Sequence, residues 1–251
     1  MGQVLIGIDD TDMPGTPGTG RVARELAASL QGLGLGRSLG VTRHQLLVHP
    51  DIPYTSHNSS LCIGMETEAP VAKLGYACLG YVTTRMVQGS DPGLCVGLAS
   101  EVDQGAREFG RRATVEVLKM DEAFRVSKTS ELWLTAVGGT GLGVIGALAG
   151  VGLRAAGMDG RFVEMRGIRA VEGVVSVREL KQRTEIVSVR DTSGVELSDG
   201  ELVDSLGWVR PSLVGGQAVL KVKRHPQMEK GWVPVERKHD KGGQQVAGQA
   251  I

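Results

Sequence analysis

A short apolar run that ends abruptly in carboxylates opens the chain, and this junction constrains the fold more than any other stretch. Residues 4–8 have the composition of a buried strand. Side chains alternate along a strand, so Asp10 and Asp12 are expected on one face of the sheet. Asp9 and Thr11 are expected on the other face. A loop of Gly, Pro and Thr follows and ends the strand.

Two interpretations of these carboxylates stay open. Clustered carboxylates repel one another, and burial in isolation would neutralise them. A divalent cation removes the conflict, and proteins usually hold Mg²⁺ with one or two carboxylates together with substrate phosphates. Asp10 and Asp12 are therefore candidate metal ligands, and Asp9 is a candidate to orient the cluster or act as a base. The alternative is an acidic turn that caps the next helix, a position where Asp and Thr are common.

A helix is expected directly after the loop. Apolar residues recur at helical spacing over residues 21–31, with Thr19 or Gly20 as the N-cap. The backbone N–H groups from Gly18 onward would then point towards an anion at the helix N-terminus. With the hydroxyl of Thr19 between strand and helix, this arrangement predicts a site for Mg²⁺ and phosphate.

A second glycine-rich segment lies at residues 138–143 and opens a small, apolar helix expected at 144–156. Glycines before a helix can cradle phosphate through backbone amides. The candidate nucleotide-binding residues there are Gly139, Thr140, Gly141 and Gly143. The segment is no Walker motif, because no Lys-Ser or Lys-Thr pair follows. Close packing of the helix on a sheet would explain the glycines equally well.

A polar loop at residues 50–60 is the third candidate. It lies between strands expected at 41–49 and 61–65 and concentrates hydroxyl, amide and imidazole groups, as binding loops on rigid scaffolds do. His57 and Asn58 are the candidates for contact with substrate or with a developing oxyanion. A well-capped turn is the alternative, since Asn and Ser are ordinary turn residues.

The remaining segments alternate between helical and strand patterns, which predicts an α/β or α+β fold. Further helices are expected at 69–88, 101–119 and 199–206, and further strands at 94–99, 162–169, 174–177, 185–190 and 217–224. Residues 236–251 are polar and weakly patterned, which indicates a disordered tail.

Composition narrows the class of protein. Apolar residues make up 41% and charged residues 22% of the 251 residues, as in a globular protein. Lys plus Arg and Asp plus Glu both total 28, so the formal net charge is zero and no strongly basic nucleic-acid face is indicated. The three cysteines match no zinc spacing and are expected to be buried free thiols. No apolar run reaches the ~20 residues that span a bilayer, so a cytoplasmic protein is expected, with monomer or homodimer open.

The chain resembles the archaeal isoleucine-tRNA 2-agmatinylcytidine synthetase family in several stretches that occur in the family's order. The most specific is Gly-Ile-Asp-Asp-Thr-Asp at residues 7–12. The other stretches are residues 18–20, 51–54 with Asn58 nearby, 91–93, 117–123 and 141–149.

The resemblance implies both a domain organisation and an activity. A kinase-like α/β domain would cover residues 1–65 and part of 160–235, and a ferredoxin-like domain would cover 66–160. A small β-rich unit would cover 161–235. The activity implied is that of an ATP- and Mg²⁺-dependent phosphoryl-transfer or ligase-type enzyme, because family members phosphorylate a tRNA cytidine before agmatine attacks it. The residues implied are Asp9, Asp10, Asp12 and Thr19 for metal binding and phosphoryl transfer, with Thr11, Gly18 and Gly20 beside the nucleotide.

The chain departs from the family pattern in ways that leave its substrate open between tRNA and a small molecule. The family's Cys-Thr-Thr is Gly-Thr-Gly at residues 18–20, two of its arginines are replaced, and no Cys-x-x-Cys pair exists for its zinc ribbon. Two other functions remain: a nucleotide sensor, or a non-catalytic RNA-binding protein. A basic patch for the latter could be formed by Arg21, Arg43, Arg111, Arg112 and Arg154.

Overall fold

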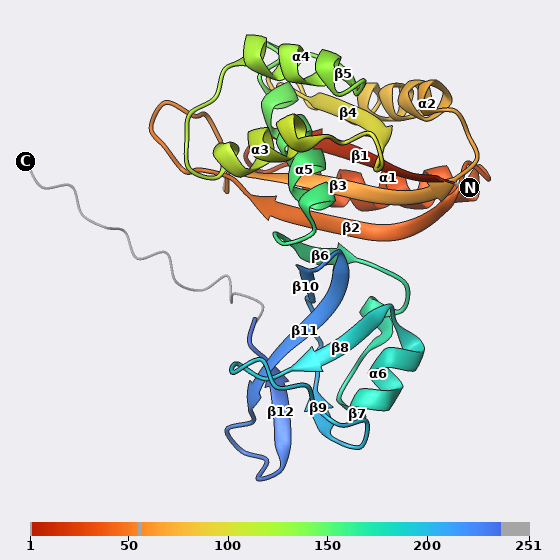
Figure 1. The fold of residues 1–251 in the computed structure, drawn as a ribbon, viewed down its shortest axis with the longest axis vertical. Coiled ribbons are helices and arrows are strands. Elements are labelled where there is room, and N and C mark those ends of the chain that lie inside the picture. Colours follow the sequence, from red (N-terminus) through yellow and green to blue (C-terminus); the bar gives the residue numbers. More distant parts are fainter. Residues whose placement is uncertain (1, 55–56, 237–251) are drawn as a thin grey trace, which may run out of the picture.

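The computed structural model describes residues 2–54 and 57–236, and these residues form two bodies stacked along the longest axis (Figure 1). The strands of the upper body are β1 (Gly2–Asp9), β2 (Arg37–Gln45), β3 (Ser59–Thr67), β4 (Gly93–Leu98) and β5 (Trp133–Ala136). Its helices are α1 (Thr19–Gly32), α2 (Val71–Thr83), α3 (Gln104–Ala113), α4 (Met120–Thr129) and α5 (Gly143–Ala156).

The lower body is richer in strands than the upper body. Its strands are β6 (Arg161–Glu164), β7 (Val174–Ser176), β8 (Ile186–Arg190), β9 (Leu202–Asp204), β10 (Ser212–Val214), β11 (Gln217–Arg224) and β12 (Gly231–Pro234). A 3₁₀ turn (Ile168–Ala170) and α6 (Val177–Arg183) accompany them. The mixture of helices and strands in both bodies confirms the α+β class.

The strands of both bodies follow one path, in the order β5-β4-β1-β3-β2-β6-β10-β11-β12-β9-β7, with β8 paired to β11. β6 pairs with β2 above it and with β10 below it, and so joins the two bodies. Both predicted units, 1–65 and 66–160, contribute strands to the upper sheet, and the predicted boundary near 160 falls between α5 and β6. Of the tail predicted at 236–251, all but Glu236 lies outside the described residues.

β1 lies at the centre of the upper sheet because its apolar side chains fill a core on each face. Ile6 and Ile8 pack into the core that α1 and α2 cover. Leu5 packs into the opposite core, with Phe109 of α3 and Leu148 of α5. In Figure 1, α5 crosses in front of the strands on this second face. The opening apolar run is therefore a buried strand, as its composition predicts.

Glycines allow α5 to lie directly on the sheet. A Cβ on Gly7 of β1 would overlap the carbonyl oxygen of Ala147, and one on Gly93 of β4 would overlap the backbone of Gly143. Such contacts between backbones need residues that have no side chain. Close helix–sheet packing, the alternative considered for the second glycine-rich segment, is thus realised at Gly143.

Two helix predictions are wrong, and two helices, α4 and α6, were not expected from the sequence. The helix expected at 101–119 begins only at Gln104, because the Asp103 carboxylate accepts a hydrogen bond of 2.9 Å from the Ala106 N–H as an N-cap. It ends at Ala113, where the Thr114 hydroxyl donates to the Arg111 carbonyl. The helix expected at 199–206 is instead β9, which pairs with β7 and β12.

The start of α6 follows from a local hydrogen bond. Its N-cap is Ser176, whose hydroxyl accepts a hydrogen bond of 3.1 Å from the Glu179 N–H. Ser-x-x-Glu is the sequence signature of a capping box, so the helix start could have been found from residues 176–179.

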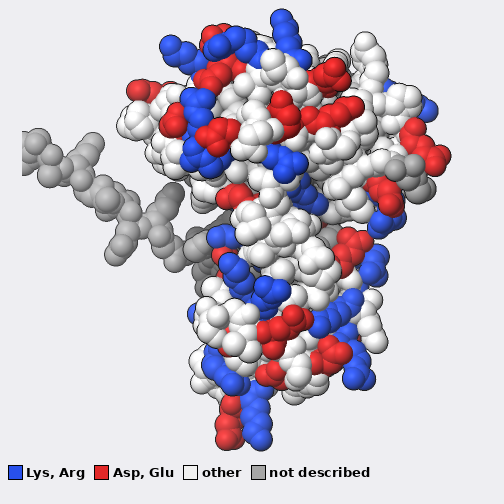
Figure 2. Space-filling model, in the orientation of Figure 1, with Lys and Arg blue, Asp and Glu red and all other residues white. Residues whose placement is uncertain are grey.

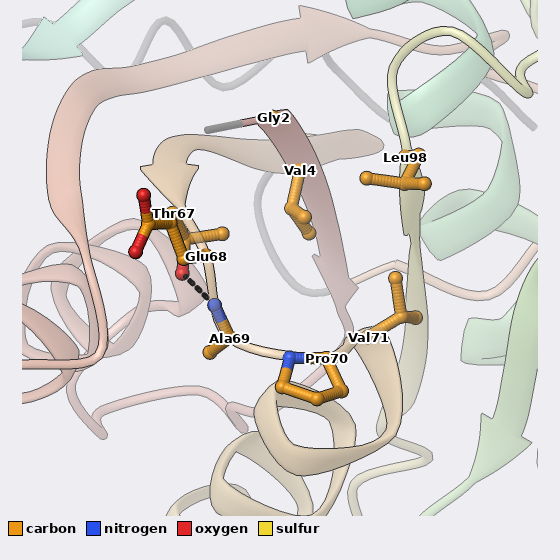
Figure 3. Close-up of a pocket in the computed structure, with 8 residues that line it drawn as sticks. All are labelled: Gly2, Val4, Thr67, Glu68, Ala69, Pro70, Val71 and Leu98. Atoms are coloured by element: carbon orange, nitrogen blue, oxygen red, sulfur yellow. Dashed lines mark hydrogen bonds between the residues drawn. The ribbon is translucent and has the colours of Figure 1, made fainter.

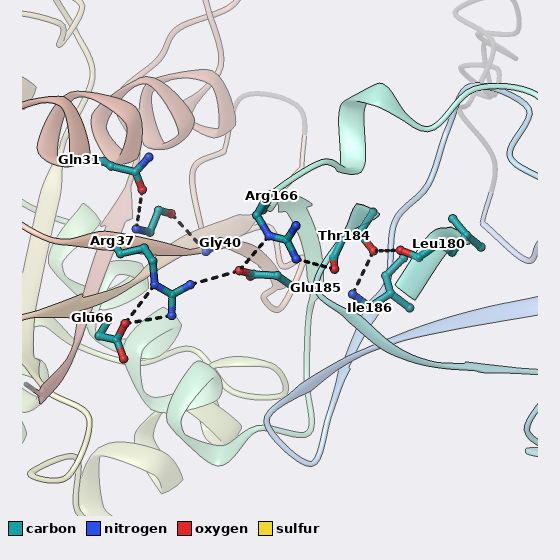
Figure 4. Close-up of polar contacts among 10 residues, drawn as sticks. Gln31, Arg37, Gly40, Glu66, Arg166, Leu180, Thr184, Glu185 and Ile186 are labelled. Carbon is teal, nitrogen blue, oxygen red and sulfur yellow. Dashed lines mark hydrogen bonds and ion pairs between the residues drawn. The ribbon is translucent and has the colours of Figure 1, made fainter. Parts of the chain in front are cut away.

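The interface between the bodies carries an ion-pair network (Figure 4). Arg37 of β2 pairs with Glu66 of β3 at 2.9 Å and with Glu185 of the lower body at 3.3 Å. Arg166 approaches the same Glu185 carboxylate at 3.9 Å. The two arginines are more than half exposed and the two glutamates are 38% and 26% exposed, so the pairs add little stability.

Candidate active site

The predicted site residues meet at one end of the upper sheet. Asp9, the last residue of β1, lies opposite Gly93, the first residue of β4. β5 ends beside them at Ala136, and β3 begins there near Leu61, which lies opposite Ile8. The connections from β1 to α1 and from β5 to α5 leave from this end. Antiparallel pairing therefore gathers three segments that are far apart in the sequence.

Asp12 binds the first turn of α1. Both the backbone N–H and the hydroxyl of Thr19 donate to its Oδ1 atom, at 2.9 and 2.6 Å. Thr19 Oγ1 in turn accepts 3.1 Å hydrogen bonds from the N–H and the hydroxyl of Thr11, which is fully buried. The N-cap is Gly18, not the expected Thr19 or Gly20. The Asp12 carboxylate thus occupies the helix N-terminus, where negative charge is favourable.

Asp10 departs from the strand. β1 ends at Asp9, and Asp10 has φ 54°, in the left-handed region. The prediction that Asp10 and Asp12 share one face of a strand is therefore wrong, because side-chain alternation stops where the extended backbone stops. Asp is among the few residues besides glycine that adopt this conformation.

The Asp9 carboxyl group is enclosed beneath the first turns of α5. A Cβ on Gly146 would overlap its Oδ2 atom. Burial, followed by the charges of Asp10 and Asp12, raises the pKa of Asp9 well above its ordinary value. The Asp9 carboxyl group is therefore easier to protonate than that of a free aspartate.

Asp91 belongs to the same cluster, although it is absent from the residues predicted from sequence. Its Oδ1 atom accepts a hydrogen bond from the Thr140 N–H, and its Oδ2 atom accepts one of 2.7 Å from the Thr140 hydroxyl. Gly139 has φ 61°, and a Cβ there would overlap Asp91 Oδ1. Residues 91–93 are one of the resembling stretches, so a signal for Asp91 did exist.

The glycine-rich segment thus has backbone groups suited to an anion, and Asp91 uses them. The Gly143 N–H donates to the Asp91 carbonyl at 3.0 Å, and Gly141 has φ 83°. A phosphate could occupy the Thr140 donors only if the Asp91 carboxylate moved away, because each donor serves one strong acceptor at a time.

His57 and Asn58 lie in the loop that leads into β3, close to the same end of the sheet. The Asn58 side chain donates to the Leu47 carbonyl at 2.6 Å, and its backbone carbonyl accepts from Leu46 at 2.9 Å. Asn58 therefore holds its own loop, as a well-capped turn requires. His57 is exposed at the loop surface.

The donor set suits Mg²⁺ shared with a phosphate. Burial, then the charges of Asp91 and Asp12, raises the pKa of Asp10 to about 6, and a cation would relieve this repulsion. In the described part of the chain, no three His, Cys, Asp or Glu side chains are grouped to hold a metal alone. Mg²⁺ commonly takes one or two carboxylates and completes its shell with water and phosphate, so Asp10 and Asp12 fit as a partial ligand set.

Because the pKa of Asp10 is raised, its contribution to the stability of the folded state is expected to fall as the pH rises. The folded state holds this proton more tightly than the unfolded chain, whose Asp pKa is about 3.9. Its stabilising contribution is complete below about pH 4 and is lost as the pH rises through 6. We expect Asp10→Asn to unfold at higher urea than wild type at pH 7.5, by about 1 kcal/mol after allowing for the partial exposure of the group.

The same urea unfolding is repeated at pH 4 as a reference. At that pH wild type and Asp10→Asn should be equally stable, because Asp10 is protonated in the folded protein. Asparagine is a suitable replacement because it also tolerates φ 54°. The control is Asp121→Asn on α4, an acid that is 73% exposed. An Asp10→Asn protein no more stable than wild type at pH 7.5 would show that the carboxylates do not destabilise the fold.

A separate pocket lies at the other end of β1 (Figure 3). It has a volume of about 350 Å³ and is lined by Gly2 and Val4, by Leu98 of β4, and by residues 67–71. β1 is eight residues long, so this pocket is roughly 20 Å from the carboxylates. It is not part of the candidate active site.

None of the helices in residues 2–54 and 57–236 has the length and hydropathy to cross a bilayer.

Comparisons with known proteins show that solved structures share the fold of this chain. No family model and no curated protein matches the chain. The structure is similar to TiaS in complex with an isoleucine tRNA and ATP, with TM-score 0.54 and 26% identity over 61% of this chain and 36% of that chain. It is similar to a tRNA fluorescent labeling enzyme, with TM-score 0.52 and 28% identity over 60% of this chain and 36% of that one. It is also similar to apo TiaS, an isoleucine-tRNA agmatidine synthetase, with TM-score 0.52 and 25% identity over 60% and 35%. The match thus spans about a third of the length of these relatives.

Proposed function

Because the chain is a structural relative of the isoleucine-tRNA agmatidine synthetases, we propose that it is an ATP- and Mg²⁺-dependent enzyme of phosphoryl-transfer or ligase type that acts in tRNA modification. One observation carries the proposal. Four carboxylates, those of Asp9, Asp10, Asp12 and Asp91, meet the N-termini of two helices at one end of the sheet. A TiaS structure of the same fold contains ATP and an isoleucine tRNA.

The nucleotide phosphates would lie between the starts of α1 and α5. Helix N-termini attract anions through free N–H groups and the helix dipole. Asp10 and Asp12 would hold Mg²⁺, which neutralises charge on the transferred phosphoryl group when bound. Thr11 and Gly18 would shape the α1 side, and Gly20, where a Cβ would meet no atom within 4 Å, leaves space beside it. The Thr140 donors would bind phosphate once Asp91 releases them.

The Thr19 hydroxyl is placed for proton transfer. It donates to Asp12 at 2.6 Å, which is the arrangement of a hydroxyl nucleophile beside a base. Asp12 could therefore accept the Thr19 proton if this hydroxyl attacked the γ-phosphoryl group of ATP, with ADP as the leaving group. Asp9, whose pKa is raised, could when protonated donate a hydrogen bond within the cluster without adding a further negative charge.

A non-catalytic protein that senses nucleotide or binds RNA is the second candidate. The contacts of Asp12 with Thr19 and of Asp91 with Thr140 favour it, because the two carboxylates occupy N–H and hydroxyl donors that a phosphoryl group in transfer would need. In this case nucleotide would bind at the same end of the sheet but would not be hydrolysed.

The test is thermal unfolding with ATP, with Mg²⁺, and with both. We expect stabilisation only when both are present, because the carboxylates need the cation and the cation needs the phosphates. At a ligand concentration of 100 times Kd the gain is about 2.7 kcal/mol, or roughly 5–10 °C for a chain of this size. An unchanged unfolding temperature under all three conditions would refute the enzyme and the nucleotide sensor together. Binding without phosphate release, with tRNA and candidate amines present, would favour the sensor.

A further inference from the structure

Two arginines from separate segments pair with one carboxylate where the two bodies meet, and a third arginine lies nearby. Arg169, in the 3₁₀ turn, pairs with Glu164 at 2.5 Å, and Arg24 of α1 approaches the same group at 3.9 Å. Arg210, just before β10, lies close enough for the charges of Arg169 and Arg24 to act on it. One glutamate cannot neutralise three guanidinium groups. The junction arginine cluster, Arg24, Arg169 and Arg210, therefore carries excess positive charge.

Arg210 is held in place by an aromatic ring. Its guanidinium lies 3.7 Å from the centre of the Trp208 ring and donates to the Val209 carbonyl at 2.8 Å. Burial, followed by repulsion from Arg169 and Arg24, lowers the pKa of Arg210 to about 10. The group stays charged at neutral pH, and an anion would relieve the repulsion.

The junction arginine cluster adjoins the candidate active site. Arg24 follows Thr19 by five residues in α1, a rise of about 7.5 Å along the helix. At the other end of β6, Arg161 lies opposite Arg43 of β2. The charge of Asp12 acts on Arg43. Arg161 pairs with Glu236 at 2.7 Å, so the positive groups that lead from the junction towards the site are Arg24 and Arg43.

The basic patch considered from sequence does not form. Arg154 is 7% exposed and lies over the Phe162 ring. On α3, Arg111 pairs with Glu108, and Arg112 pairs with Glu116 and Glu122. On the face drawn in Figure 2, which α5 crosses, acidic and basic side chains are intermixed. These arginines of α3 and α5 therefore contribute no free positive charge to such a patch.

We propose that the junction arginine cluster, with Trp208, binds the phosphate backbone of RNA and leads it towards the carboxylates of Asp10 and Asp12. Arginine matches phosphate oxygens with two parallel donors, and planar arginine–aromatic stacks suit the unpaired bases of RNA. Because the net charge of the chain is zero, affinity for a polyanion must come from such a local excess. The inference deepens the proposed function by placing its RNA partner.

The test measures binding of unfractionated tRNA, without ATP, at several salt concentrations. The variant is Arg24→Gln, Arg169→Gln and Arg210→Gln combined. Each phosphate-contacting arginine should contribute about 1 to the magnitude of the negative slope of log K against log salt. The triple variant should therefore have a slope smaller in magnitude by about 3. Its affinity for tRNA at low salt should be at least tenfold lower. Because Arg210 is half-buried, the Arg24→Gln, Arg169→Gln pair is measured too, with an expected fall of about 2.

The control replaces three cations on the other face, Arg111, Arg125 and Lys128, by glutamine and should bind tRNA as wild type does. An equal loss of tRNA affinity in the control and in the triple variant would overturn the proposal. So would a paired variant, Arg24→Gln with Arg169→Gln, that binds tRNA with the affinity and salt dependence of wild type. Preference for anionic phospholipid vesicles over tRNA, lost in the paired variant, would also overturn it. Since ATP is absent, tRNA binding without nucleotide turnover supports this surface even if the proposed enzymatic function fails.

Discussion

Replacing both Asp10 and Asp12 by asparagine is expected to lower ATP turnover by a factor on the order of 10² to 10³, the effect of removing preorganised charge stabilisation from an active site. Asparagine keeps the shape of each side chain, and its carbonyl can still accept the Thr19 hydrogen bonds that Asp12 accepts at 2.6 and 2.9 Å. The loss of ATP turnover should therefore result from the missing negative charge and not from unfolding of the protein. The measurement is phosphate release at saturating Mg²⁺ and ATP.

Two comparisons make this result specific. Asp121→Asn on α4, 73% exposed, should turn over ATP at the wild-type rate. The double variant should also be more stable than wild type at pH 7.5, since it removes the ionised Asp10 carboxylate, whose pKa is raised by burial and then by the charges of Asp91 and Asp12. Turnover within threefold of wild type would exclude these residues from the chemistry.

The second large effect concerns the packing of α5. We expect Gly7→Ala to destabilise the protein by about 3 kcal/mol or more, at the upper end of overpacking effects. The new methyl group would overlap the Ala147 carbonyl and lie 2.9 Å from Val151 Cγ2. A helix backbone cannot turn aside as a flexible side chain can, so α5 must shift as a unit. Urea unfolding measures the loss.

Gly80→Ala in α2 is the matched control. A Cβ there meets no atom within 4 Å, and alanine favours helix by up to about 1 kcal/mol over glycine. This variant should therefore be as stable as wild type or more so. A Gly7→Ala protein that unfolds at the same urea concentration as Gly80→Ala would show that α5 does not rest on β1 through backbone contact.

The sequence predicts most of the secondary structure around the candidate site. The buried strand at 4–8, the helix after the loop and the helix after the second glycine-rich segment all form, because apolar periodicity reports which face must leave water. The carboxylates at the strand end also form a cluster. Local hydrogen bonds were harder to anticipate: Asp103 and Ser176 place helix starts that periodicity alone misses.

Residue order alone was enough to predict most strands and helices that bear the acids and glycines, together with the family that the chain resembles. Which side chains meet in space became known only from the folded chain. Asp91 joins Asp10 because β4 pairs with β1, and Arg210 joins Arg24 because β6 links the two bodies. The physical reason is that periodicity records burial along one segment, whereas strand pairing across 80 residues or more leaves no local signature; Asp10 and Asp91 are 81 positions apart.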